Sequence, residues 1–269
     1  MDPKPRACFS FSILNDLRRF QEYLEQINRC GMENGYGCPI PYVVFTSKAR
    51  GVFNLGGDLE FFLRCQEENN RDALRRYADL CIDVLFSNFV SYDLPMTTFI
   101  LAKGEALGGG FEAVLSGNVI VAEHDAQFGF PEILFNMFPG MGAYSLLARK
   151  IGSSLAEKII LSGKIYSATE MYEMGIVDVL AEPGKGEDAI RDYVARLSRK
   201  RNAFQALLKV RRIVNKIDRR ELDEIAEIWV DAALHIGPKD RKLMERLIKA
   251  QKRAQVEFER EENVREIRA

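Results

Sequence analysis

The chain has 269 residues, of which 47% are hydrophobic and 29% are charged, and its formal net charge is -1. This length and composition predict one sizeable α/β domain with an appended element, and they exclude a disordered, collagen-like or disulfide-dense chain. The near-neutral charge excludes a general electrostatic attraction to nucleic acid or to a membrane surface.

The five cysteines do not form any Cys-x-x-Cys pair. This pattern favours neither a disulfide framework nor a zinc site, and it fits a reducing compartment. The first residues are not followed by an apolar segment of signal-peptide type, and no apolar run is long enough to cross a bilayer. We therefore expect a cytoplasmic protein that uses no metal and no cofactor and does not enter a membrane.

The first predicted element is an amphipathic helix over 15–29, with Asn15 as its N-cap. A buried strand is predicted at 42–46, where a run of β-branched and aromatic residues lies between prolines and a polar turn. A helix over 71–88 and a second strand over 97–102 complete a strand-helix-strand unit.

Short strands are predicted at 119–122, 127–130 and 177–181, separated by turns or helical stretches. Continued alternation of strands and helices favours a largely parallel sheet. The remaining pattern is helical almost throughout, so we divide the chain into an α/β core over 1–196 and a helical C-terminal section over 197–269.

A glycine-rich segment at 104–115 directly follows the strand predicted at 97–102, and it holds three successive glycines before Glu112. Glycine lets a substrate come close to main-chain N–H groups, and these glycines open onto a helix N-terminus with partial positive charge. The segment can bind a developing oxyanion. A tight turn without a ligand explains it equally well when it is considered alone.

A second glycine-rich loop at 51–59 follows the first predicted strand. Asp58 is the expected N-cap of a helix that begins at Leu59, which leaves the N–H of Gly57 free to point outward. Two N–H groups from separate loops, those of Gly57 and Gly109, would form a two-donor oxyanion hole for a thioester carbonyl.

Glu112 and Glu132 each have a structural explanation, because a glutamate in a first helical turn complements the helix dipole. Their neighbours favour a catalytic role, because apolar side chains would desolvate the carboxyl groups and raise at least one pKa. A protonated carboxyl beside an ionised one can serve as acid and base. The neighbours in question are Phe111, Phe128, Phe130, Ile133, Leu134 and Phe135.

The motif Gly104-x-x-x-Gly108-Gly109-Gly110-x-Glu112, followed by the segments 128–132 and 139–142, resembles the crotonase (enoyl-CoA hydratase/isomerase) superfamily. The earlier Gly-Gly-Asp-Leu at 56–59 adds a fourth match in the same order. The resemblance implies a spiral core of repeated β-β-α turns and a homotrimer or dimer of trimers assembled through the C-terminal helices. It also implies the oxyanion hole and the acid/base pair proposed above.

A closer likeness is to the diffusible signal factor synthases of bacterial quorum sensing, on the segments 51–59, 108–113, 138–145 and 228–231. It implies dehydration of a 3-hydroxyacyl chain on acyl carrier protein to a cis-2-enoyl chain, hydrolysis of the thioester to the free fatty acid, and contact with a sensor kinase. In this dehydration we assign Glu132 as the base and Glu112 as the acid.

Two other functions stay open: an enoyl-CoA hydratase or isomerase acting on CoA esters, and a noncatalytic interaction module that regulates a sensor kinase. Both glutamates are present, which disfavours the second. An acidic carrier protein would dock on basic groups. The candidates are Lys48, Arg50, Arg149, Lys150 and Arg199 to Arg201. Core packing is an equal alternative for the expected acyl-binding residues, which are Phe111, Phe130, Leu134, Met137, Met141 and Trp229.

Overall fold

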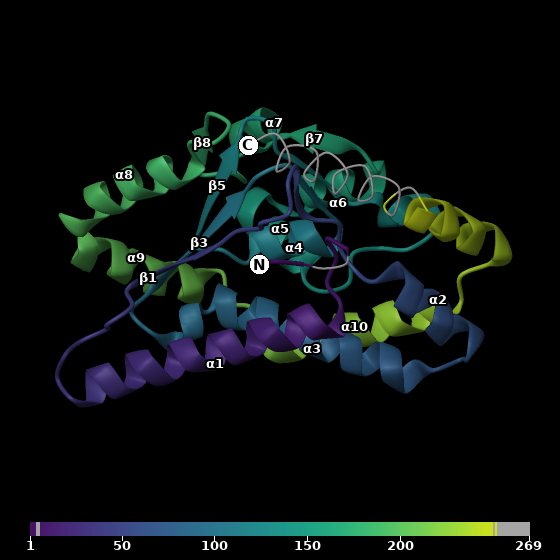
Figure 1. The fold of residues 1–269 in the computed structure, drawn as a ribbon, viewed down its shortest axis with the longest axis horizontal. Helices are drawn as coiled ribbons and strands as arrows, with labels where there is room; N and C mark the ends of the chain where they lie inside the picture. Colours follow the sequence, from purple (N-terminus) through teal and green to yellow (C-terminus); the bar gives the residue numbers. More distant parts are fainter. Residues whose placement is uncertain (4–5, 250, 252–269) are drawn as a thin grey trace, which may run out of the picture.

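The protein is described from a computed structural model, in which residues 1–3, 6–249 and 251 are described. Its core contains two four-stranded sheets (Figure 1). The first sheet is parallel throughout, in the order β1 (Tyr42–Phe45), β3 (Thr97–Ala102), β5 (Val119–Glu123) and β8 (Val179–Ala181). Every residue of β3 is buried, as expected for a central parallel strand covered on both faces.

The second sheet has the order β2 (Val52–Asn54), β4 (Glu105–Leu107), β6 (Gln127–Gly129) and β7 (Ile165–Ser167). Its first three strands are parallel and β7 is antiparallel. Successive strand pairs place one strand in each sheet before the chain enters a helix, which is the β-β-α repeat expected from the crotonase resemblance. The predicted fold class is confirmed, with two sheets in place of a single one.

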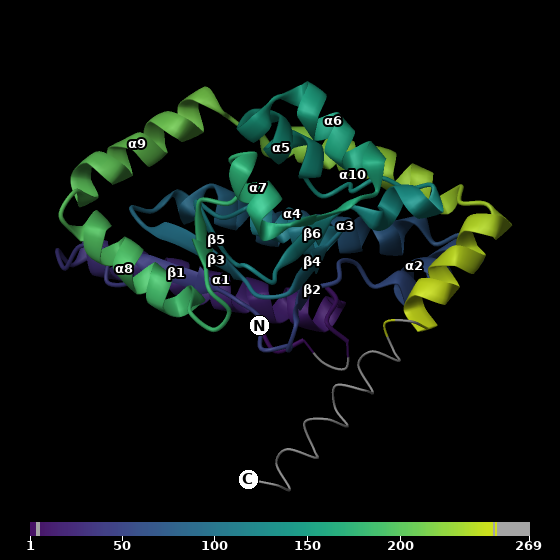
Figure 2. The same cartoon turned by 90° about the horizontal axis from the view of Figure 1, so that it is seen from above.

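Helices surround the sheets (Figures 1 and 2). The helix α1 (Phe11–Glu33) begins earlier than predicted, because Ser10 and not Asn15 is its N-cap: the Ser10 hydroxyl accepts a hydrogen bond from the N–H of Ile13. Asn15 lies inside the helix, where its amide donates to the carbonyl of Phe11. The next helices are α2 (Leu59–Glu67), α3 (Arg71–Phe89), η1 (Ser91–Asp93) and α4 (Gly109–Leu115).

The second half of the chain is mostly helical. Its helices are η2 (Pro131–Phe135), α5 (Ala143–Ile151), α6 (Ser153–Ser162), α7 (Ala168–Glu173), α8 (Gly186–Ser198), α9 (Arg201–Val214), α10 (Arg219–Leu234) and a helical stretch at 238–249. The predicted boundary at 196 falls near the end of α8. The charged tail after residue 249 lies outside the described residues, apart from Gln251.

The helix α10 packs against α3, and ion pairs join the two helices at their exposed edge. Arg75 contacts both Asp223 and Glu227, and Arg71 contacts Asp231. No helix in the described part of the chain combines the length and apolar character needed to cross a membrane.

Candidate active site

Two glycine loops meet at the carboxyl ends of the neighbouring strands β2 and β4. Gly57 lies between β2 and α2, and Gly109 is the first residue of α4. A Cβ placed on Gly109 would lie 3.6 Å from the Gly57 nitrogen, so the two main chains are in close contact. Neither N–H donates a hydrogen bond within the described residues. Asp58 caps α2 as predicted, with its carboxylate accepting from the N–H of Phe61.

Glu112 lies in the first turn of α4, and its side chain is buried. Its Oε1 accepts hydrogen bonds from the N–H of Met141, at 2.8 Å, and from the N–H of Ala143, at 3.0 Å. Burial raises the pKa of Glu112 to about 7, while these N–H groups at the start of α5 oppose the rise. The donors therefore favour the ionised form of Glu112.

Glu132 follows Pro131 at the start of η2, and its carboxyl group lies against Gly108. Its Oε2 is buried and has no hydrogen-bond partner among the described residues. Burial, together with the negative charge of Glu112, raises the pKa of Glu132 to about 8. Because Glu112 has two N–H donors on its Oε1 and the Oε2 of Glu132 has none, a single proton shared by the pair is favoured on Glu132.

Gly108 is required for this arrangement, because its φ is +54° and a Cβ there would lie 2.3 Å from Oε1 of Glu132. We expect Gly108→Ala to displace the Glu132 carboxyl group and to lower kcat by about tenfold or more, since a displacement of about 1 Å is costly in a catalytic site. Steady-state kinetics will measure the effect. Gly175→Ala is the matched control, because its φ is +76° and nothing lies within 4 Å of its Cβ. Equal losses in the two variants would contradict the explanation.

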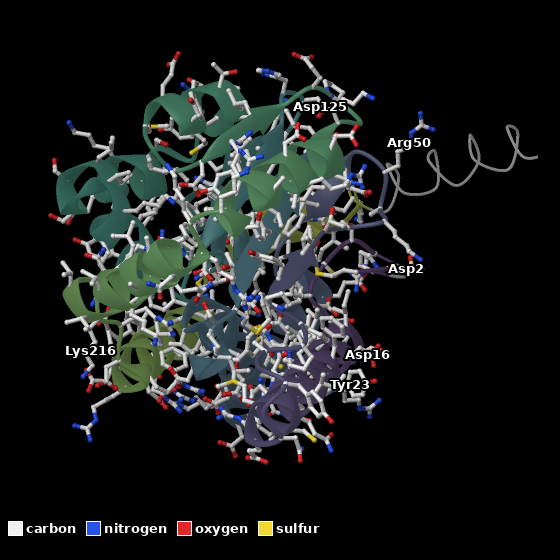
Figure 3. All side chains as sticks on the ribbon, turned by 90° about the vertical axis from the view of Figure 1, so that its left-hand side faces the viewer. Asp2, Asp16, Tyr23, Arg50, Asp125 and Lys216 are labelled. Atoms are coloured by element: carbon white, nitrogen blue, oxygen red, sulfur yellow. The ribbon has the colours of Figure 1, made fainter. Side chains whose placement is uncertain are left out.

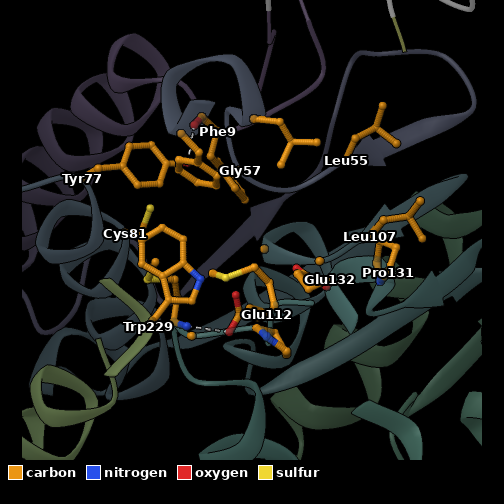
Figure 4. Close-up of a pocket in the computed structure, with 18 of the residues that line it drawn as sticks. Phe9, Leu55, Gly57, Tyr77, Cys81, Leu107, Glu112, Pro131, Glu132 and Trp229 are labelled. Carbon is orange, nitrogen blue, oxygen red and sulfur yellow. Dashed lines mark hydrogen bonds between the residues drawn. The ribbon is translucent and has the colours of Figure 1, made fainter. Parts of the chain in front are cut away.

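The glutamates and the glycine pair line one end of a cavity of about 340 Å³ (Figure 4). The rest of its wall is mostly apolar, and much of it comes from α2, α3, α10 and the stretch at 238–249. Met137, Met141 and Trp229, which were predicted to bind an acyl chain, all line this cavity. The ring of Trp229 packs edge-on against Phe62, with centroids 5.1 Å apart.

The other three predicted acyl-binding residues do not line the cavity, so their assignment is corrected. Phe111 and Phe130 are fully buried and stack on each other with ring centroids 4.8 Å apart. Their rings therefore fill the hydrophobic core. The side chain of Leu134 is 56% exposed and lies beside Gly163. Sequence proximity to the glutamates did not reveal which way these side chains point.

Several other wall residues, which come from α2 and α3, were not predicted from the sequence. Tyr77, Cys81 and Leu85 on α3 line the cavity, as does Gln66 on α2. A helix over 71–88 was predicted, but its periodicity did not indicate that one face would border a substrate cavity. In the described part of the chain, no three His, Cys, Asp or Glu side chains are grouped so as to hold a metal ion.

Two carboxyl groups beside paired N–H donors and an apolar cavity suit acid/base chemistry on an acyl thioester. Comparison with known proteins identifies the group of enzymes, because the family model described as enoyl-CoA hydratase/isomerase matches residues 22–263. The chain belongs to the enoyl-CoA hydratase/isomerase family. The resemblance to the crotonase superfamily is thereby confirmed.

Curated relatives of this family member are aligned over part of their length only. Cyclohexa-1,5-dienecarbonyl-CoA hydratase of Thauera aromatica is 37% identical over 39% of this chain and 42% of its own. The fatty acid oxidation complex subunit alpha of Pseudomonas savastanoi pv. phaseolicola is 32% identical over 57% of this chain and 21% of its own. The chain thus spans less than half the length of either relative.

A solved structure supports the fold. The enoyl-CoA hydratase from Bacillus halodurans superposes with a TM-score of 0.67 at 23% identity, covering 84% of this chain and 88% of that one. The expected closeness to the diffusible signal factor synthases is not tested by these comparisons and stays a prediction.

Proposed function

We propose that this protein hydrates 2-enoyl thioesters of coenzyme A, adding water across the C2–C3 double bond. The observation that carries the proposal is the unequal environment of the two glutamates beside the N–H groups of Gly57 and Gly109, which donate no hydrogen bond within the described residues. Glu112 accepts two N–H hydrogen bonds on Oε1, whereas Oε2 of Glu132 has no partner in the described residues. An ionised Glu112 beside a protonated Glu132 is the state that hydration requires.

In the proposed reaction, the thioester carbonyl accepts hydrogen bonds from Gly57 and Gly109. Glu112 removes a proton from water as the water oxygen bonds to C3, and the electron pair of the double bond moves to form an enolate. The two N–H donors stabilise the charge on the enolate oxygen. Glu132 then gives its proton to C2. After this step Glu112 is protonated and Glu132 is ionised. The starting state is restored when Glu112 releases its proton to solvent and Glu132 takes one up from solvent.

The test is to incubate the purified protein with a 2-enoyl-CoA and to follow the loss of absorbance of the conjugated thioester. Mass spectrometry of the product separates the activities of the family, because hydration adds the mass of one water and isomerisation leaves the mass unchanged. A 3-hydroxyacyl-CoA product supports the proposal. A shifted double bond without added mass, or no reaction across a series of chain lengths, would contradict it.

The two carboxyl groups lead to a prediction for the pH dependence of kcat/KM. Activity should fall below about pH 7 because Glu112 becomes protonated, and above about pH 8 because Glu132 loses its proton. The profile should therefore be a narrow bell, with the two apparent pKa values belonging to the pair. Initial rates between pH 5 and pH 10 (about two units beyond each limb) test this. A rate independent of pH across this range would exclude the assigned protonation states.

Dehydration of a 3-hydroxyacyl thioester is the reverse of the proposed hydration. Dehydration followed by hydrolysis of the thioester is the reaction predicted from the likeness to diffusible signal factor synthases. The unpartnered Oε2 of Glu132 favours it as a second candidate, because a carboxylate in this position could activate water toward the carbonyl carbon. Dehydration requires an ionised Glu132 and a protonated Glu112. This is the less favoured placement of the single proton that the two carboxyl groups share. Incubation with a 3-hydroxyacyl carrier protein tests it: a free cis-2-unsaturated acid supports this candidate, and a product that remains a thioester excludes it.

Docking of a carrier protein would use fewer basic groups than the sequence suggested. Arg149 is paired with Glu221, and Lys150 is paired with Asp178. The remaining candidates are all exposed: Lys48, Arg50 and Arg199 to Arg201. The side chain of Arg50 points away from the body of the protein (Figure 3). If the carrier docks here, the rate with the carrier-bound substrate should decrease with added salt more steeply than the rate with the CoA ester.

Assembly into a homo-oligomer fits the surface of α9, which lies at the edge of the molecule (Figure 2). Four apolar side chains of this helix are more than half exposed, and they are Leu207, Val210, Ile213 and Val214. Contact with further copies would bury them. We expect Ile213→Asp to lower the molar mass measured by light scattering, whereas Lys209→Asp should not. A mass unchanged by Ile213→Asp would contradict assembly through α9. The expected contact with a sensor kinase stays a prediction.

A further inference from the structure

Gln66 places a polar group in the apolar part of the cavity. It lies in the last turn of α2 and lines the cavity, and its side chain is only 6% exposed. Its Nε2 donates a hydrogen bond of 2.6 Å to the carbonyl of Ala233, near the end of α10. A carbonyl can only accept, so this contact fixes which end of the amide carries the nitrogen. The other atom is therefore the acceptor Oε1.

The Oε1 of Gln66 has no hydrogen-bond partner among the described residues. The only other buried side-chain atom without a partner that belongs to a described cavity residue is Oε2 of Glu132. The wall of the cavity is mostly apolar and includes Phe62, Trp229 and Met244. A buried acceptor without a donor is unfavourable, so Oε1 is poised for a donor that a ligand supplies.

Gln66 lies further along α2 than the end of the helix that contacts Gly57, the proposed donor to the thioester carbonyl. The ring of Phe62 packs against Gly57, where a Cβ would lie 2.5 Å from the ring. Gln66 follows Phe62 by four residues on α2, which is about 6 Å further along the helix axis on the same face. An acyl chain that begins at the Gly57 N–H and runs along this face of α2 would reach Gln66 with its distal carbons.

From this geometry we infer that Gln66 makes the enzyme selective for acyl thioesters that carry a hydroxyl group on the distal part of the chain. This inference rests on the proposed hydration of 2-enoyl thioesters. The hydroxyl donates its hydrogen to Oε1 of Gln66, while the methylene groups before it contact Phe62 and Trp229. A plain alkyl chain of the same length leaves Oε1 buried and without a partner. Sites built to bind a hydroxyl discriminate strongly against analogues that lack it.

The experiment compares matched pairs of 2-enoyl-CoA substrates with the same number of carbons, one ending in a hydroxyl and the other in a methyl group. The chain length is varied so that the terminal group ends before Gln66 in the shortest substrates, beside it in some, and beyond it in the longest. At one length, we expect kcat/KM to be about tenfold or more higher for the hydroxylated substrate. Hydration of all substrates without preference for the hydroxyl at any length would overturn the inference and leave the proposed function intact.

Gln66→Met tests the residue itself, because methionine has similar length and no amide acceptor. The variant should lose the preference, with kcat/KM falling for the hydroxylated substrate and rising or staying level for the alkyl one. The four-carbon 2-enoyl-CoA is the control, since its chain is too short to reach Gln66 and its turnover reports an intact fold and site. Unchanged turnover of this control together with a retained preference in Gln66→Met would overturn the assignment. Absence of any hydration by the wild-type protein would instead overturn the proposed function.

Discussion

Glu132→Gln is expected to lower kcat for hydration by at least about a hundredfold, with little change in KM, because glutamine cannot deliver the proton that C2 requires. The substitution conserves volume, so the cavity and the glycine pair should keep their shape. Steady-state kinetics with a 2-enoyl-CoA measure the loss. The matched control is Glu105→Gln, which makes the same chemical change at another residue of the same cavity. Equal activity of Glu132→Gln and the control would remove Glu132 from the mechanism.

The stability of the same variant provides a second measurement. The pKa of Glu132 is raised from 4.5 to about 8 in the folded protein. A raised folded-state pKa contributes stability below the unfolded value, and this contribution is lost as the pH rises through the folded value. The wild-type melting temperature should therefore decrease between about pH 5 and pH 8 more steeply than that of Glu132→Gln. Parallel curves for the two proteins would show that Glu132 is not held in its protonated form.

Glu112→Gln and Glu112→Ala are expected to lose activity to a similar extent and to differ in stability. Either variant should lower kcat by at least about a hundredfold, because neither can accept a proton from water. The amide oxygen of glutamine can still accept the hydrogen bonds from Met141 and Ala143, whereas alanine leaves both buried donors without an acceptor. We expect Glu112→Ala to be less stable than Glu112→Gln by about 1–3 kcal/mol.

Denaturant unfolding of the two variants measures this difference, and the activity assay runs on the same samples. If Glu112 served only to hold the start of α5, Glu112→Gln would keep both its stability and its activity. If both variants were equally stable, the N–H groups of Met141 and Ala143 would not need the Glu112 carboxylate as their hydrogen-bond acceptor. The combination of low activity with retained stability in Glu112→Gln is the result that identifies a catalytic base.

The sequence determined the elements whose signals are local. The strand predicted over 97–102 is β3, because a continuous apolar and β-branched run is typical of a strand buried on both faces. Asp58 caps α2 as predicted, since the capping carboxylate contacts an N–H only three residues later. The strands β2, β4 and β7 were missed. The first two lie inside the segments interpreted as glycine-rich loops, and β7 has only three residues, too few to show an alternating pattern.

Sequence motifs also identified the two glutamates and the two glycines, because close approach of a main chain and burial of a carboxyl group each require particular residue types. Only the tertiary structure decided which groups surround them. The donors to Glu112 come from Met141 and Ala143, and the apolar wall comes from helices that are distant in the sequence. A pKa depends on every group packed around a carboxyl, and a cavity depends on which helix faces meet. Neither property belongs to a local segment, so the sequence could name the candidate residues but could not assign the proton or outline the cavity.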